Sequence, residues 1–89
     1  MLEREVTISN KLGLHARASA KLVQLLQGYK CHAYLIHRGR EINAKSIMGV
    51  MMLAAGIGNT IWLRTDGADE EAALNDMVAL FERKFDEGA

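Results

Sequence analysis

The sequence predicts an α+β fold with the element order βαββαβα, in which three helices cover one face of a four-stranded antiparallel sheet. Two kinds of segment alternate along the chain. In one kind, polar and apolar residues alternate, as in half-buried strands, and in the other the apolar residues recur at helical spacing. A sheet covered on one face would bury all of these apolar stripes. The other face is expected to stay open to water and to carry Tyr34, Ile36 and Trp62, which alternate out of phase with the inward residues.

The first half of the chain supplies two strands of this pattern, a helix, and a third, shorter strand. Residues 5–9 alternate polar and apolar side chains and predict the first strand. Residues 16–27 carry apolar side chains at helical spacing, and Gly28 can end that helix. The β-rich segment 31–36 is followed by a turn, after which residues 41–44 can return as its partner strand.

The second half predicts a short helix, the fourth strand and a longer helix. The short helix follows Ser46, because apolar residues there recur at i, i+3 and i+4, which also places Met51 in the core. Residues 60–65 predict the fourth strand, and acidic residues at 69–71 open the last helix at its positive end. The buried stripe of that helix is expected to consist of Leu74, Met77, Val78, Phe81 and Phe85.

Composition limits what the chain can be. Its 89 residues suit one small domain, residues 1–89, and no linker or repeat divides them. Lys plus Arg equals Asp plus Glu at 11 each, so no basic excess favours nucleic acid as a partner. No apolar run is long enough to insert into a membrane, and no signal peptide is visible. The single Cys31 excludes an internal disulfide and fits a reducing compartment, so a cytoplasmic location is expected.

Metal and cofactor chemistry is not expected. The sequence has no CxxC or HExxH motif and no paired Cys/His clusters. The only feature that leaves a metal site open is the presence of His32 and His37 on one segment.

The segment around His15 is the first candidate site. His15 follows a glycine loop and directly precedes the first predicted helix, so it is expected at the helix N-cap. The first turn of a helix has unpaired N–H groups and the positive end of the macrodipole, and Arg17 adds a permanent cation. A phosphoryl group on the imidazole could therefore be held by Arg17 and the backbone N–H groups of residues 16–18, namely Ala16, Arg17 and Ala18. The alternative is a polar loop histidine beside a solvated arginine.

Ser46 is the second candidate. It stands immediately before the short helix, where its hydroxyl can cap the first turn, and a phosphate there would also be favoured by the helix dipole. Met48 and Met52 fall off the apolar stripe of that helix. Such methionines either form an adaptable surface for partners or pack against neighbouring loops, and both readings stay open.

Both segments resemble the HPr family of phosphocarrier proteins of the bacterial phosphoenolpyruvate phosphotransferase system. Residues 13–17, GLHAR, are similar to the family's active-site motif, and residues 45–51, KSIMGVM, to its regulatory serine motif. The resemblance covers nearly the whole chain and implies an open-faced β-sandwich. It implies that His15 accepts a phosphoryl group from enzyme I on Nδ1 and passes it to an EIIA-type protein, as a carrier rather than an enzyme in the strict sense.

The resemblance also implies regulation and partners. Ser46 can be phosphorylated by an ATP-dependent HPr kinase/phosphorylase in organisms that have one. The chain is expected to act as a monomer whose flat surface meets enzyme I and the acceptor in turn. The rim of that surface is predicted to consist of Ala20, Gln24, Met48, Met51 and Met52.

Three features depart from the family's pattern or leave its branch open. Ala18 stands where members usually carry proline, which predicts a looser helix entry. Gln24 and Gln27 replace lysines found in many members, which weakens the basic rim. Residues 10–12 resemble the nitrogen-related branch, whereas the serine motif resembles the regulated sugar branch.

Two other classes of function remain as alternatives. One is a purely regulatory binding module in which Ser46 is the modified residue and His15 is structural. The other is a small-ligand-binding α/β sandwich, which would not need a histidine at a helix cap.

Overall fold

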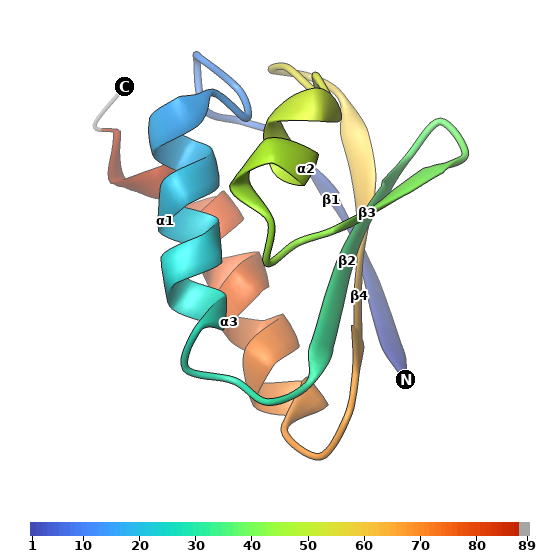
Figure 1. The fold of residues 1–89 in the computed structure, drawn as a ribbon. Coiled ribbons are helices and arrows are strands. Elements are labelled where there is room, and N and C mark those ends of the chain that lie inside the picture. The colour runs from blue at the N-terminus through green and yellow to red at the C-terminus, as the bar shows by residue number, and fades with distance from the viewer. Residues whose placement is uncertain (88–89) are drawn as a thin grey trace.

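The computed structural model describes residues 1–87, which form one four-stranded antiparallel sheet covered by helices on one face (Figure 1). The strand order in the sheet is β1-β4-β2-β3. The elements in chain order are β1 (Leu2–Thr7), α1 (Ala16–Leu26), β2 (His32–His37), β3 (Arg40–Asn43), α2 (Ile47–Met52), β4 (Thr60–Asp66), α3 (Glu70–Glu82) and the 3₁₀ turn η1 (Lys84–Asp86). This architecture confirms the α+β open-faced sandwich and the order βαββαβα.

The central strands show how alternation builds the two faces. Along β4 the side chains of Ile61, Leu63 and Thr65 are buried, while the residues between them point away from the helices. Leu63 lies opposite Leu35 of β2, so two fully buried leucines meet under the helical layer. Burying a side chain of this size contributes about 1.5–3 kcal/mol, and such pairs fix the register because a slip by one residue would turn them to water.

The open face carries the residues that the sequence placed there. Tyr34 and Ile36 are half-buried, and Trp62 is 44% exposed. On the same face, the Arg64 guanidinium donates to the Glu3 carboxylate at 2.5 Å, and this bond raises the pKa of Arg64. The face is therefore a mixed aromatic and ion-paired surface.

Two local expectations are wrong. The first strand spans Leu2–Thr7 rather than residues 5–9, because the backbone of the earlier residues finds partners in β4, starting with Leu2 opposite Thr65. Met51 is 39% exposed and not part of the core. In the short helix α2 only Val50 is buried, so the side of this helix that faces the core is too narrow to include Met51.

The last predicted helix ends earlier than its apolar pattern indicates. Helix α3 stops at Glu82, and Phe85 lies in η1, where all three residues have positive φ, including 54° for Phe85. Phe85 is nevertheless 1% exposed, and its ring packs on Phe81 with centroids 4.8 Å apart. The left-handed turn brings Phe85 into the core from a new direction and carries the next residues toward the start of α1 (Figure 1).

Asp69 at the start of α3 joins two parts of the fold. Its carboxylate accepts the backbone N–H groups of Lys30 at 2.8 Å and Cys31 at 2.9 Å, and these bonds hold the pKa of Asp69 below its ordinary value. The next residue, Glu70, accepts the N–H of Gly67 at 3.1 Å, which likewise lowers its pKa. The acidic start of α3 therefore fixes the loop that enters β2.

Candidate functional site

His15 is the N-cap of α1. Its backbone is extended, with φ −75° and ψ −179°, and its Nδ1 accepts the backbone N–H of Ala18 at 3.1 Å. Its carbonyl accepts the N–H of Ser19 at 2.9 Å. A nitrogen that accepts a hydrogen bond carries no proton, so the neutral ring has its proton on Nε2. The Nδ1 lone pair consequently points at the N-terminus of the helix.

The loop that precedes His15 packs closely against the segment after α2. Gly13 has φ +64°, and a Cβ there would lie 2.8 Å from the carbonyl oxygen of Ala55 and the Cα of Gly56. The N–H of Leu14 donates to that same Ala55 oxygen at 3.1 Å. Only glycine suits both the positive φ and this close approach. The entry to α1 is therefore tied to the exit of α2.

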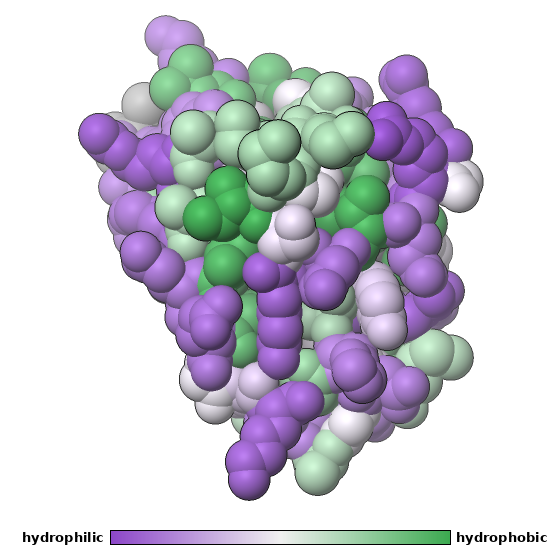
Figure 2. Space-filling view, in the orientation of Figure 1, coloured by the Kyte–Doolittle hydropathy of each residue, from purple (hydrophilic) through white to green (hydrophobic). Residues whose placement is uncertain are grey.

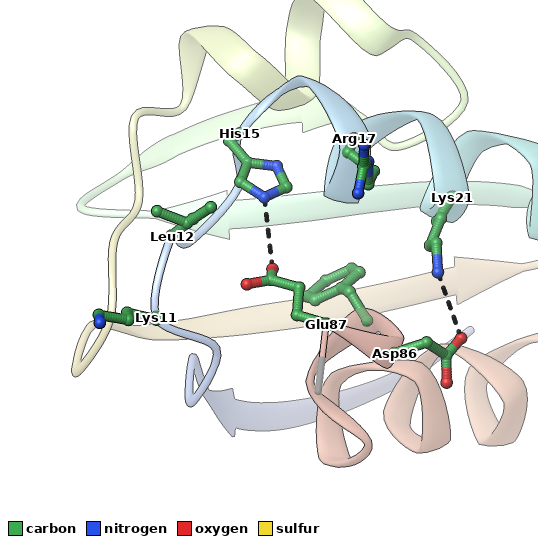
Figure 3. A pocket seen from close by; sticks show the side chains of 8 residues that line it. Lys11, Leu12, His15, Arg17, Lys21, Asp86 and Glu87 are labelled. Atoms are coloured by element: carbon green, nitrogen blue, oxygen red, sulfur yellow. Dashed lines mark ion pairs between the residues drawn. The ribbon is translucent and has the colours of Figure 1, made fainter. Parts of the chain in front are cut away.

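His15 opens onto a cavity of about 530 Å³ between the start of α1 and the C-terminal turn (Figure 3). Three cationic side chains line it, and one of them, Lys21, pairs with Asp86 at 3.6 Å. Within residues 1–87 the side chains of Lys11 and Arg17 form no ion pair or hydrogen bond. Lys11 and Arg17 are thus lining cations of this cavity that remain available to an anion. The lining residues are Lys11, Leu12, His15, Arg17, Lys21, Phe85, Asp86 and Glu87.

Backbone donors at the helix start add to this positive site. In the described part of the chain the N–H groups of Ala16 and Arg17 have no acceptor, as expected for the first positions of a helix. The third predicted donor, Ala18, gives its N–H to His15 Nδ1. Proline at this position would have no N–H to give. The alanine therefore adds a contact to the imidazole that proline could not make.

A carboxylate that sequence reasoning missed lies on the other side of the ring. Glu87 Oε2 is 3.4 Å from His15 Nε2 and accepts a bond of 2.5 Å from the side-chain amide of Asn10 (Figure 3). Asn10 is fully buried and also donates to the Gly13 carbonyl at 2.8 Å. No sequence signal predicted this contact, because it depends on the left-handed turn after α3.

Ser46 is the N-cap of α2. Its Oγ accepts the backbone N–H of Gly49 at 3.1 Å, and its own N–H donates to the Asn43 carbonyl at 3.1 Å. Lys45 beside it donates from Nζ to the Tyr29 carbonyl at 2.7 Å, which anchors the segment that leads into the helix. The hydroxyl is half-buried and already has a structural role as a cap.

Apolar side chains gather over α2 (Figure 2). Met48 is 68% exposed and Met52 is 60% exposed, and Met51 is exposed to a smaller extent. Three further apolar residues are exposed that were not predicted as part of the docking surface, namely Leu12, Ile47 and Ile57. We call the six exposed residues Leu12, Ile47, Met48, Met51, Met52 and Ile57 the apolar rim.

The two docking residues predicted on α1 lie beside a different group of side chains. Ala20 is half-buried and Gln24 is exposed. Gln24 lines a shallower cavity together with Lys21, Arg83 and Asp86, so it faces the C-terminal turn. Helices α1 and α2 pack against each other, which places the apolar rim and the cation-lined cavity on neighbouring elements.

Metal clusters and membrane-spanning helices are both absent from residues 1–87. No cluster of three or more histidine, cysteine or acidic side chains there could hold a metal ion. None of the helices in that range has the length and apolar character needed to span a bilayer.

Known proteins are similar to this chain over nearly its whole length. The family model described as the PTS HPr component phosphorylation site matches residues 2–83. A phosphocarrier protein HPr of Cupriavidus necator is 57% identical over 88 residues, covering 99% of both chains. A phosphocarrier protein NPr of Shewanella violacea is 44% identical over 88 residues, covering 99% of this chain and 97% of the relative.

Solved structures agree with this likeness. The crystal structure of HPr-C-His from Thermoanaerobacter tengcongensis has a TM-score of 0.94 and 41% sequence identity, and 98% of each chain is covered. The HPr dimer from the same organism has a TM-score of 0.76 and 41% identity, with 96% of this chain and 98% of that chain covered.

Proposed function

The chain belongs to the HPr family of phosphocarrier proteins, and from this premise we propose that His15 accepts a phosphoryl group from phosphorylated enzyme I and passes it to an EIIA-type protein. The observation that carries the proposal is the His15 imidazole at the start of α1, with Nδ1 unprotonated and facing the helix N-terminus. Neutral imidazole is a good nucleophile near neutral pH.

The transfer step needs no chemistry beyond the ring itself. The Nδ1 lone pair forms a bond to phosphorus while the bond between phosphorus and the donor breaks, and the electron pair of the broken bond returns to the donor. The Nε2 proton stays on the ring, which gains positive charge. On formation of the bond, the Ala18 N–H that now donates to Nδ1 turns to a phosphoryl oxygen. Onward transfer to the acceptor runs the same step in reverse.

The charged surroundings suit a phosphoryl group. Its oxygens can take the free N–H groups of Ala16 and Arg17, and the Arg17 guanidinium offers a planar fork for two of them. Lys11 adds a second cation on the far side of the cavity. Positioning and charge stabilisation of this kind dominate the catalysis of phosphoryl transfer.

The partners follow from the family. We expect the apolar rim around His15 to be covered by enzyme I and by the acceptor in turn, in the cytoplasm, with Ser46 as the regulatory position and an HPr kinase/phosphorylase as its modifying enzyme. The sugar branch is the first candidate, since the Cupriavidus relative is named HPr. The NPr relative at 44% identity makes a nitrogen-branch relay with a regulatory output the second candidate.

Incubation with phosphoenolpyruvate and enzyme I tests the proposal directly. The chain should acquire one phosphate that is lost in acid and kept in alkali, as a phosphohistidine requires, and should then lose it to an EIIA-type protein. A purely regulatory module would gain no such phosphate, and the proposal would then be wrong. Acceptor proteins from the sugar and nitrogen branches, tested at equal concentration, distinguish the two candidates by their transfer rates.

Arg17→Lys should slow transfer without weakening the fold. Lysine keeps the positive charge but loses the planar fork that pairs with two phosphoryl oxygens. We expect the rate of transfer to the acceptor to fall at least about tenfold, roughly 1.4 kcal/mol of barrier. The melting temperature should hardly change, since the Arg17 side chain forms no hydrogen bond or ion pair within residues 1–87. Equal transfer rates for the variant and the parent would make Arg17 a bystander.

A further inference from the structure

Both nitrogens of the His15 ring face a polar partner, and only one of the two contacts belongs to the helix cap. Nδ1 accepts from the Ala18 N–H at 3.1 Å, whereas Nε2 lies 3.4 Å from the carboxylate of Glu87. The side chain of Glu87 is 10% exposed and that of His15 is 25% exposed. The imidazole therefore lies between the helix start and a shielded negative charge (Figure 3).

The structure holds Glu87 in place through its neighbours. Phe85 anchors the turn in the core, and Asp86 pairs with Lys21 of α1 at 3.6 Å. The Asn10 amide donates to Glu87 at 2.5 Å and to the Gly13 carbonyl at 2.8 Å. Because both acceptors are oxygens, they fix the orientation of this amide, and its Oδ1 is left buried without a partner within residues 1–87. The buried amide is thus committed to orienting the carboxylate.

The distance between His15 Nε2 and Glu87 Oε2 leaves room for this contact to shorten during phosphoryl transfer. At 3.4 Å the contact between Nε2 and Oε2 is longer than the 2.7–3.2 Å typical of N–H···O hydrogen bonds. The ring gains positive charge when Nδ1 bonds to phosphorus, and hydrogen bonds between charged partners shorten to about 2.7–2.9 Å and strengthen. An interaction that strengthens during the step lowers the barrier rather than merely improving binding.

We propose that Glu87 is a positioning residue of phosphoryl transfer, whose carboxylate holds the Nε2–H of His15, keeps the Nδ1 lone pair directed at the helix N-terminus, and offsets the positive charge that the ring gains as Nδ1 bonds to phosphorus. The proposal rests on the function proposed above. In the step, the bond between phosphorus and the donor breaks as the Nδ1 bond forms, and the proton stays on Nε2 beside Glu87.

Steady-state transfer from phosphorylated enzyme I tests the charge. Glu87→Gln keeps an oxygen that can accept from Nε2 but removes the negative charge, so kcat should fall about tenfold with KM unchanged. Glu82→Gln is the matched control, because Glu82 is an exposed carboxylate at the end of α3 outside the cavity. A kcat for Glu87→Gln equal to the parent's, or a fall shared by Glu82→Gln, would overturn the proposal.

Nitrogen-15 NMR of the unphosphorylated protein tests the orientation without any partner protein. In the parent, the neutral His15 ring should carry its proton on Nε2. Glu87→Ala removes the carboxylate beside Nε2 but leaves the Ala18 N–H that donates to Nδ1. We therefore expect the Nε2 signal of His15 to shift, while the signals of His32 and His37 stay in place. Unchanged His15 signals in Glu87→Ala would refute the positioning role.

The two proposals fail in different ways. If the parent chain takes no phosphate from enzyme I, the proposed function is wrong, yet the NMR comparison still tests whether Glu87 holds the ring. If the parent and Glu87→Gln are phosphorylated at equal rates, the function stands and the role of Glu87 is refuted. The neutral Glu87→Gln variant keeps the size of the side chain, so it serves as a folded variant if Glu87→Ala is unstable.

Discussion

His15→Ala should abolish phosphorylation by phosphoenolpyruvate and enzyme I and leave the fold intact. No other histidine of this chain lies at a helix N-terminus. His32 is exposed on β2, where its ring stacks on Tyr34 with centroids 6.5 Å apart. His37 donates from Nδ1 to the Thr60 carbonyl at 3.3 Å, so that nitrogen carries a proton and has no lone pair for phosphorus. Labelling should therefore fall to background.

A control variant separates lost chemistry from lost structure. His15→Asn keeps an N-cap side chain that can accept the Ala18 N–H but provides no nucleophile, so it should be unlabelled and as stable as the parent. His15→Ala loses the cap bond, which costs about 0.5–2 kcal/mol at typical N-caps. Labelling by mass spectrometry and thermal unfolding are the two measurements. Phosphate on His32 or His37 in either variant would contradict the assignment.

Local sequence signals predicted the parts of the site that are built locally. The N-caps at His15 and Ser46 lie where a polar residue meets an apolar helical stripe, and the structure places both residues there. The glycine loop that the sequence places before His15 is also observed, and Gly13 in it has a positive φ. Caps and turns depend on a few neighbouring residues, which is why a single sequence is enough to predict them.

The missed parts depend on contacts between distant segments. Phe85 continues the apolar spacing of α3, so periodicity extended the helix through it, whereas the chain turns at η1 and packs Phe85 from another direction. Glu87 and Asn10 are 77 residues apart, and nothing in their local sequence links them. Met51 was assigned to the core because helical spacing shows which side of a helix faces the core. It does not show how many residues on that side are buried.

The second large effect is expected at Ser46, through the partner surface rather than the fold. Ser46 caps a helix of six residues, which at 1.5 Å per residue is about 9 Å long. The other end of α2 leads into the segment that contacts Gly13 and Leu14. A partner that covers His15 and the exposed methionines of α2 would therefore also come close to Ser46. A phosphate there carries about 1.5 to 2 negative charges at pH 7 and opposes desolvation of the apolar rim.

Ser46→Asp should consequently raise the KM for this protein in the enzyme I reaction by about 5- to 150-fold, the range of coupling free energies of 1–3 kcal/mol. The fold should keep its stability, because aspartate is a good N-cap and can accept the Gly49 N–H that Ser46 Oγ now takes at 3.1 Å. Ser46→Asn is the matched neutral variant, since it also caps the helix but adds no charge. Titration of all three proteins against enzyme I separates the two roles of Ser46. A raised KM for Ser46→Asp alone identifies charge as the cause, whereas three equal KM values would leave Ser46 as a helix cap without a switch.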